Sequence, residues 1–287
     1  MTRKEARRGM VLVTVLWSIS LLSALAMAAS VTFRGFAGVM VVDRNRVQSD
    51  ALLTAGLEAS ASTIETIGDT PLREIEITLT LATGSVRAHL NDEGGRIDVG
   101  KAPLEVLAAL LQSVGAPAAA ADGIARRIDE LRGGGKPASG ETKLGTRQPF
   151  TDIAQFVSQL GQISGVRPEW LAAIVPLTTV YGSETVNPLT APRGVVAALP
   201  GVNGERLEAF LVERRSHPAD ADRMARALGS GQRYLAAQPQ RVVAIELMTT
   251  VTGGHAAAAH AVIVVLPQDS EPYRVLVFSP RRSTQLL

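Results

Sequence analysis

Residues 7–33 read RRGMVLVTVLWSISLLSALAMAASVTF, and no charged side chain occurs between Met10 and Phe33. As an α-helix, residues 10–33 would extend about 36 Å, which exceeds the roughly 30 Å thickness of the hydrocarbon core of a bilayer. The stretch therefore predicts a helix that is long enough to span a membrane.

Positive charge is concentrated directly before this apolar run. Residues 1–9 carry a net charge of +3, which leaves −1 on the rest of a chain whose net charge is +2; the charged residues are Arg3, Lys4, Glu5, Arg7 and Arg8. Because basic residues remain on the cytoplasmic side of a membrane, we expect a cytoplasmic N-terminus and a body on the opposite side. A body with a charge of −1 does not favour a polyanion, so we expect no nucleic-acid partner.

Three interpretations of the apolar run are open on the residues alone. A secretory signal peptide has the same charged start, and Ala26-Met27-Ala28 would serve as its cleavage site. A plain membrane anchor requires only the apolar length. The third interpretation is a prepilin-type leader at residues 1–9, which would be cut between Gly9 and Met10 so that the apolar helix stays on the mature protein.

The order of basic residues, glycine and apolar helix at residues 7–17 resembles the site that prepilin peptidase cleaves in pilins and pseudopilins. Glycine suits this bond, because a peptidase at the membrane surface must reach the backbone and a side chain would obstruct it. The resemblance implies that Met10 becomes the mature N-terminal residue, which is usually N-methylated in the family.

Thr14 occupies the fifth mature position, where most pilins and pseudopilins have a glutamate. A carboxylate inside hydrocarbon is unfavourable unless it is paired, and the family pairs it with the amine of the preceding subunit. A subunit that begins a fibre has no such neighbour, and the K-type minor pseudopilin of type II secretion typically lacks this glutamate. A small β-branched residue is also ordinary in a membrane helix, so Thr14 by itself leaves both explanations open.

The long helix is expected to continue through residues 34–68 and to end before Thr70-Pro71, because helix breakers are few until that point. Val47, Ala51 and Ala55 recur at four-residue spacing, which predicts the face that packs on the body.

Alternating apolar side chains then predict an antiparallel sheet. Isoleucine or leucine occupies every second position from Ile75 to Leu81, and a turn at residues 82–84 leads to a second strand at 85–90. Three further strands rich in Val, Ile and Leu are predicted near the C-terminus, at residues 241–252, 256–266 and 273–279.

Residues 101–236 show helix and loop patterns without a strand pattern, and a loop is expected at 133–149. We therefore predict an α+β fold in which a pilin-like long N-terminal helix packs on an antiparallel sheet that carries a large all-α insertion. The expected divisions are a leader at 1–9, a transmembrane part at 10–33, a pilin-like body at 34–100 and 237–287, and the insertion at 101–236. A large helical insertion also distinguishes the K-type pseudopilin from its smaller relatives.

Two further elements resemble parts of the K family: NDEGGRIDVG at residues 91–100 and VNPLTAP at residues 186–192. In the first, Asp92, Glu93 and Asp98 are candidates for holding a hard cation such as calcium, although their spacing is not that of an EF-hand loop. A solvated turn with one side-chain cap explains the same residues. Structural calcium is therefore the one cofactor that the sequence leaves open.

The sequence offers no catalytic constellation, so we expect no enzyme activity. Cysteine is absent, the four histidines are dispersed, and the glycine run at residues 133–136 lacks the flanking residues of a phosphate-binding loop.

The family resemblance instead implies a minor pseudopilin in the bacterial inner membrane with its main body in the periplasm. Its function would be to prime or cap the type II secretion pseudopilus for export of folded proteins across the outer membrane. Its partners would be the I-type and J-type minor pseudopilins, the major pseudopilin and prepilin peptidase.

One alternative function comes from residues 199–202, LPGV, which resemble half of a helix-hairpin-helix. In DNA-binding proteins such a hairpin can hold a phosphate with its backbone amides. The chain would then be a membrane-tethered periplasmic module for DNA binding or uptake, with Arg193 and Arg206 as the nearest cations.

Overall fold

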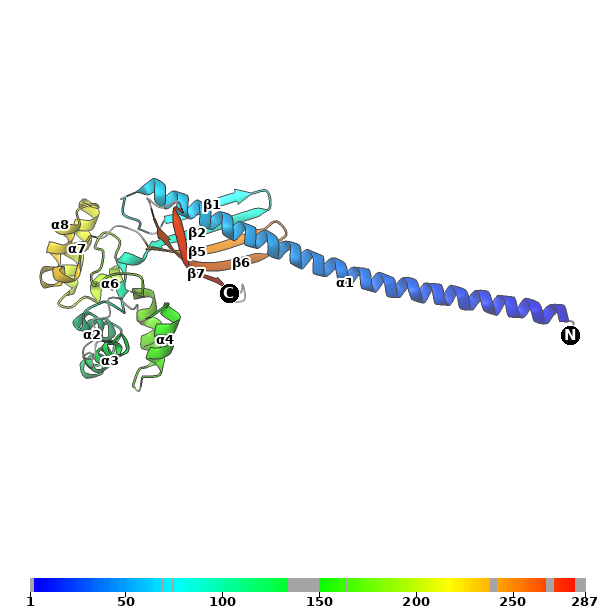
Figure 1. The fold of residues 1–287 in the computed structure, drawn as a ribbon, viewed down its shortest axis with the longest axis horizontal. Coiled ribbons are helices and arrows are strands. Elements are labelled where there is room, and N and C mark those ends of the chain that lie inside the picture. The colour runs from blue at the N-terminus through cyan, green and yellow to red at the C-terminus, as the bar shows by residue number, and fades with distance from the viewer. Residues whose placement is uncertain are drawn as a thin grey trace.

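The protein is described by a computed structural model that covers residues 3–68, 70–73, 75–133, 150–163, 165–237, 242–266 and 271–281, with the side chains of residues 3–12 and 31–38 left aside. Helix α1, Arg3–Ile67, comprises 65 residues and extends far beyond the folded body (Figure 1). It ends where Gly68 adopts a φ of 58° and donates its N–H to the carbonyl oxygen of Ile64 at 3.2 Å. The predicted single long helix is therefore confirmed.

The N-terminal half of α1 presents an apolar surface that the chain itself does not cover. Val13–Ser30 has a mean hydropathy of 1.8, and none of its side chains is buried. By length and composition this segment can cross a membrane. Large apolar side chains such as Trp17, Leu21 and Leu25 are at least two-thirds exposed in the isolated chain.

The sheet contains five antiparallel strands in the order β1-β2-β5-β6-β7. Its strands are β1 Ile75–Leu81, β2 Gly84–Asp92, β5 Val242–Val251, β6 Ala256–Val265 and β7 Tyr273–Arg281. All five predicted strands are confirmed. Strand β2 pairs with β5, with Leu90 opposite Ile245. This pairing joins the N-terminal and C-terminal strands into one sheet, although the helical residues lie between them in the chain.

The C-terminal half of α1 packs on one face of this sheet, but not mainly through the predicted residues. Val47 and Ala51 are exposed and Ala55 is half-buried, whereas the buried face includes Leu52, Leu53, Gly56, Leu57, Ser60, Ala61 and Ile64. The leucines bury more apolar area than alanines can, which favours this face. A Cβ atom at Gly56 would lie 2.7 Å from Cγ2 of Val86 and 2.9 Å from Cδ2 of Leu247, so glycine permits the close approach of helix and sheet.

The residues between β2 and β5 form a helical module at the end of the molecule opposite the N-terminus (Figure 1). Its α-helices are α2 Leu104–Ser113, α3 Ala118–Leu131, α4 Ile153–Gly161, α5 Pro168–Ile174, α6 Arg193–Ala197, α7 Gly204–Ser216 and α8 Ala221–Ala227. The 3₁₀ helices are η1 Glu93–Gly95, η2 Val175–Leu177 and η3 Gly229–Tyr234. The helical character predicted for this region is confirmed, while the predicted loop at 133–149 lies almost entirely outside the described residues.

One expectation for this module was wrong, because a short strand does interrupt the helices. Strand β4, Thr178–Thr179, pairs in parallel with β3, Ile97–Asp98, which immediately follows η1. Two residues of ladder are too short to produce a recognisable alternation in sequence. Their pairing depends on contacts between segments about 80 residues apart.

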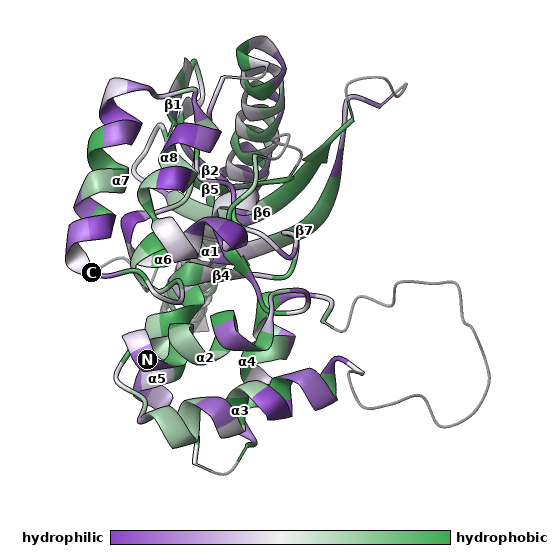
Figure 2. Ribbon diagram, turned by 90° about the vertical axis from the view of Figure 1, so that its left-hand side faces the viewer, coloured by the Kyte–Doolittle hydropathy of each residue, from purple (hydrophilic) through white to green (hydrophobic). Residues whose placement is uncertain are grey.

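Two separate hydrophobic cores result from this arrangement. One lies between α1 and the sheet and includes Leu57, Leu90 and Ile263. The other fills the helical module. It consists of buried residues between Ile97 and Leu235 in the chain and includes large side chains such as Phe156 and Phe210. In Figure 2 the sheet strands are largely green (hydrophobic), whereas α7 and α8 carry purple (hydrophilic) stretches. The division predicted at residues 101 and 236 stays a prediction, and Ile97 and Val99 already contribute to the helical core.

Candidate functional site

The predicted processing residues lie near the start of α1. Gly9 and Met10 are in its first turns, and their side chains lie outside the described residues. Thr14 is exposed on the helix, and its carbonyl oxygen accepts a 2.8 Å hydrogen bond from Oγ of Ser18. Cleavage after Gly9 and methylation of Met10 stay predictions.

A second candidate site lies where the sheet meets the helical module, at the end of β2. Asp92 closes this strand and caps η1, because its Oδ1 accepts a 3.1 Å hydrogen bond from the N–H of Gly94. Its Oδ2 accepts a 2.5 Å hydrogen bond from Oγ1 of Thr190 and a 3.4 Å hydrogen bond from Nδ2 of Asn187. Burial raises the pKa of Asp92, although these hydrogen bonds and the charge of Arg96 oppose the increase.

The turn that supplies Asn187 and Thr190 belongs to the VNPLTAP element and is held against η1 by backbone contacts as well. The N–H of Asn187 donates to the carbonyl oxygen of Gly94 at 2.8 Å. A Cβ atom at Gly95 would lie 2.8 Å from the carbonyl carbon of Thr190 and 2.9 Å from its oxygen. The two sequence elements that resemble parts of the K family therefore form one interface in the fold.

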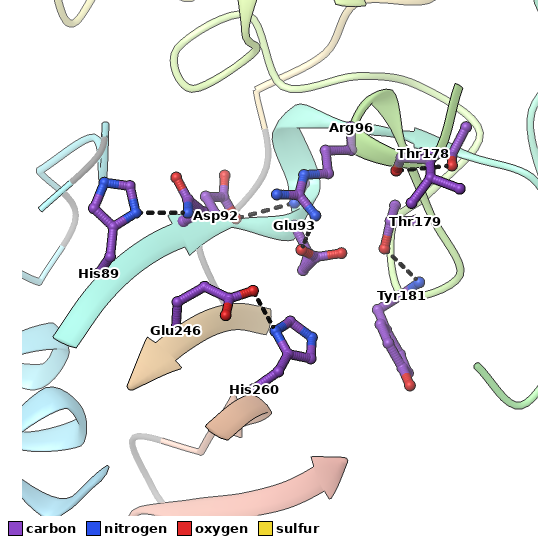
Figure 3. A network of polar contacts seen from close by, with 12 residues as sticks. His89, Asp92, Glu93, Arg96, Thr178, Thr179, Tyr181, Glu246 and His260 are labelled. Atoms are coloured by element: carbon purple, nitrogen blue, oxygen red, sulfur yellow. Dashed lines mark hydrogen bonds and ion pairs between the residues drawn. The ribbon is translucent and has the colours of Figure 1, made fainter. Parts of the chain in front are cut away.

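Glu93 and Arg96 form a mostly buried ion pair beside Asp92 (Figure 3). Nη1 of Arg96 donates to Oε1 of Glu93 at 2.9 Å, and the Thr179 side chain adds a hydrogen bond to the carboxylate. Burial raises the pKa of Glu93, and the charge of Arg96 counteracts this effect only in part.

Asp98 is separated from these residues by its own set of partners. Its Oδ1 accepts a 2.7 Å hydrogen bond from the N–H of Gly100, while Nζ of Lys101 lies 3.5 Å from Oδ2. That Oδ2 atom is buried and has no well-formed hydrogen bond. Burial raises the pKa of Asp98, and Lys101 opposes the increase.

The three acidic residues therefore do not form the solvated turn that the sequence favoured. Asp92, Glu93 and Asp98 are 6%, 3% and 1% exposed, because the helical module covers them; the expected side-chain cap is present in Asp92. Within the described residues, no group of three or more His, Asp or Glu side chains is placed to hold a metal ion. A calcium site made by these three residues together does not fit their placement, since each carboxylate faces a different protein partner.

A further polar network lies on the sheet face opposite α1. His260 of β6 lies across from Glu246 of β5, and its Nδ1 is 2.9 Å from Oε1 of Glu246 (Figure 3). Arg281 approaches the other carboxylate oxygen at 3.0 Å. Burial alone would raise the pKa of Glu246, but the hydrogen bond and charge of His260 together with Arg281 lower it.

The hairpin at residues 199–202 and the arginines near it form hydrogen bonds and an ion pair with other groups of the protein. Gly201 adopts a φ of 75°, and its carbonyl oxygen accepts a 2.8 Å hydrogen bond from Nη1 of Arg206. The same nitrogen is 3.0 Å from Oγ of Ser230, and Arg193 pairs with Glu208 at 2.6 Å. Both cations that a phosphate would need are therefore engaged with protein groups.

Comparison with known proteins supports the fold. No family model matches the chain, and no curated protein sequence matches it. It is similar to one chain in the crystal structure of the GspK-GspI-GspJ complex from the type 2 secretion system of enterotoxigenic Escherichia coli. The TM-score is 0.54 at 16% sequence identity, and the match covers 84% of this chain and 100% of that chain. The fold is pseudopilin-like.

Two residues at the junction between the pseudopilin-like body and the helical module were not identified by sequence reasoning. Arg73 precedes β1 and donates from Nε to the carbonyl oxygen of Leu189 at 2.7 Å, while Arg214 of α7 donates to that of Ala191 at 2.6 Å. Neither arginine belongs to a periodic pattern or a motif. Their importance follows only from the tertiary contact between the body and the helical module.

Proposed function

We propose that the chain is a K-type minor pseudopilin located at the tip of the type II secretion pseudopilus. There it would prime or cap fibre assembly for export of folded proteins across the outer membrane. One observation carries the proposal: a single helix, α1, both packs on a pseudopilin-like sheet and continues into an apolar segment that the chain leaves uncovered.

The uncovered segment supports a role in assembly rather than catalysis. Large apolar side chains are exposed all along Val13–Ser30, as expected for a helix that contacts lipid and neighbouring helices. With the basic residues at its start in the cytoplasm, the body lies in the periplasm. I-type and J-type minor pseudopilins and the major pseudopilin are the proposed helix partners.

The position of the helical module supports placement at a fibre tip. The module lies at the end of the molecule opposite the N-terminus of α1 (Figure 1). In a fibre built from parallel helices, a bulky module at that end occupies the space that a subunit stacked above this one would need. Thr14 agrees with this placement, because a first subunit has no preceding amine with which a glutamate could pair.

Mass analysis of the mature N-terminus tests the proposal directly. A product that begins at Met10 and carries one methyl group agrees with prepilin peptidase processing. A product that begins near Ala29 means that a secretory peptide has been removed together with the apolar helix, and the proposal then fails.

Cysteine cross-linking tests the partners, because the chain has no native cysteine to compete. Leu21→Cys, on the uncovered segment, should cross-link to I-type or J-type pseudopilins that carry single cysteines in the same membrane. Val212→Cys, exposed on α7 of the helical module, is the matched control and should not cross-link to another pseudopilin. Equal cross-linking at both positions would contradict a tip location.

The DNA-binding alternative makes a different prediction for the full chain in detergent. At low salt, where phosphate contacts are strongest, we expect no binding to duplex DNA. Binding that is lost in Arg206→Ala but kept in Arg126→Ala, an exposed arginine on α3, would favour the alternative instead.

A further inference from the structure

A cavity of about 400 Å³ lies at the junction between the pseudopilin-like body and the helical module. Arg73 and Asp92 contribute to its wall from the body, and Arg96 follows directly after η1. Thr190, Arg193 and Arg214 contribute from the helical module. Both parts of the molecule are therefore needed to form it. Its volume falls within the range of ligand-binding pockets, about 300–1,000 Å³.

Two of the four arginines in this wall have only neutral partners. Arg73 donates from Nε to the carbonyl oxygen of Leu189 and from Nη2 to that of Pro218, both at 2.7 Å. Arg214 donates from Nη1 to the carbonyl oxygen of Ala191 and lies over the ring of Phe210. In the described chain neither guanidinium forms an ion pair with a carboxylate. Each retains N–H donors beyond these bonds, since a guanidinium carries five.

The other charged groups of the wall leave this positive charge uncompensated. Arg96 is paired with Glu93 and Arg193 with Glu208. Asp92 is the one carboxylate in the wall, and its oxygens already accept hydrogen bonds from Thr190, Gly94 and Asn187.

The pKa shifts of Arg73 and Arg214 agree with an uncompensated positive charge in the cavity wall. Burial lowers the pKa of Arg73. Burial, together with repulsion from Arg73 and Arg215, lowers that of Arg214. Two mutually repelling cations without counterions are stabilised by an anion placed between them.

We propose that this cavity binds a small organic polyanion, a molecule with two or more carboxylate or phosphate groups, through Arg73 and Arg214. Guanidinium groups bind both kinds of oxyanion with paired N–H donors. A single inorganic phosphate is much smaller than the cavity, whereas a tricarboxylate fills more of it. The bound anion connects the body to the helical module and stabilises their junction.

Calorimetric titration of the full chain in detergent tests this binding. Citrate is the polyanion probe and inorganic phosphate the single-group probe. Every sample contains EDTA, because citrate also binds divalent cations, and ionic strength is held constant with sodium chloride. We expect saturable binding of one citrate per chain, at least 10-fold tighter than phosphate, and a higher midpoint of thermal unfolding with citrate. Absence of saturable citrate binding would overturn the proposal.

Three variants locate the bound anion. Arg214→Met and Asn91→Asp should each weaken citrate binding at least 10-fold, whereas Arg126→Met, at an exposed position on α3, should leave it unchanged. Asn91 also lies in the cavity wall, and Asn91→Asp adds a negative charge there without removing either arginine. It therefore keeps the test valid if Arg214→Met does not fold. Equal binding by Asn91→Asp and the wild type would place citrate elsewhere and contradict the proposal.

Discussion

Oγ1 of Thr190 donates a 2.5 Å hydrogen bond to Oδ2 of Asp92, although 98 residues separate the two in the chain. Asp92 ends strand β2 of the body, and Thr190 belongs to the turn that precedes α6 of the helical module. The carboxylate is almost fully buried and also accepts a hydrogen bond from the N–H of Gly94. One side chain therefore connects the body to the helical module.

Replacement of Asp92 should weaken this connection. Asp92→Ala removes the acceptor of hydrogen bonds from the half-buried Thr190 hydroxyl and Gly94 N–H and from the buried Asn187 amide, so we expect a loss of about 1–3 kcal/mol in the free energy of unfolding. Denaturant unfolding of the full chain in detergent measures the loss. Asp122→Ala, at an exposed position on α3, is the control and should change stability by less than about 0.5 kcal/mol. A similar small change in Asp92→Ala would contradict a structural role for this carboxylate.

Glu93 should make stability depend on pH in a defined direction. Burial raises its pKa above the ordinary value of 4.5, so the folded chain retains a proton at pH values where the unfolded chain has lost it. Stability contributed by Glu93 therefore increases as pH falls from neutral toward 4.5. As the pH falls over this window, we expect the unfolding free energy of the wild type to increase relative to that of Glu93→Gln.

Unfolding measured at several pH values gives this difference. Glu184→Gln, at an exposed position, is the matched control and should follow the wild type at each pH. If the unfolding free energy of Glu93→Gln also changed with pH as that of the wild type does, burial would not be raising the pKa of Glu93.

Two helical glycines should respond in opposite ways to alanine. At Gly56 a Cβ atom would lie 2.7 Å from Val86 and 2.9 Å from Leu247, so Gly56→Ala should force α1 away from the sheet at a cost of about 1–3 kcal/mol. Gly123, inside α3, has no atom within 4 Å of the same position. Gly123→Ala should therefore stabilise the chain by about 0.5–1 kcal/mol, because alanine is the better helix former. Thermal unfolding of the two variants distinguishes them, and a stabilising effect at both positions would be inconsistent with this packing.

Gly9 should control processing of the leader. In Gly9→Val a branched side chain lies next to the bond to be cut and hinders access to the backbone, so we expect the chain to retain residues 1–9. Intact-mass measurement of the membrane-extracted protein detects this retention. Met10→Leu keeps the glycine and serves as the control, since it should still be cut after Gly9. Normal cleavage of Gly9→Val would show that this glycine is not the recognised residue.

Features with a local period could be predicted from the sequence. The apolar run and scarcity of helix breakers predicted α1 as one helix, and alternation from Ile75 to Leu81 predicted β1. The face of α1 that packs on the sheet was predicted incorrectly at Val47 and Ala51. Four-residue spacing identifies a helical stripe, but which stripe is buried depends on the opposing surface, here the side chains around Gly56.

The amino-acid sequence by itself determined the long apolar helix, the strands and the helical character of residues 101–236, because hydrophobic periodicity acts between residues a few positions apart. Only the tertiary structure decided the pairing of β3 with β4, the contact of Asp92 with Thr190, and the meeting of Arg73 and Arg214 in one cavity. These contacts join segments far apart in the chain. Their partners are selected by packing and by the need to satisfy buried polar groups, which leave no periodic signal in the sequence.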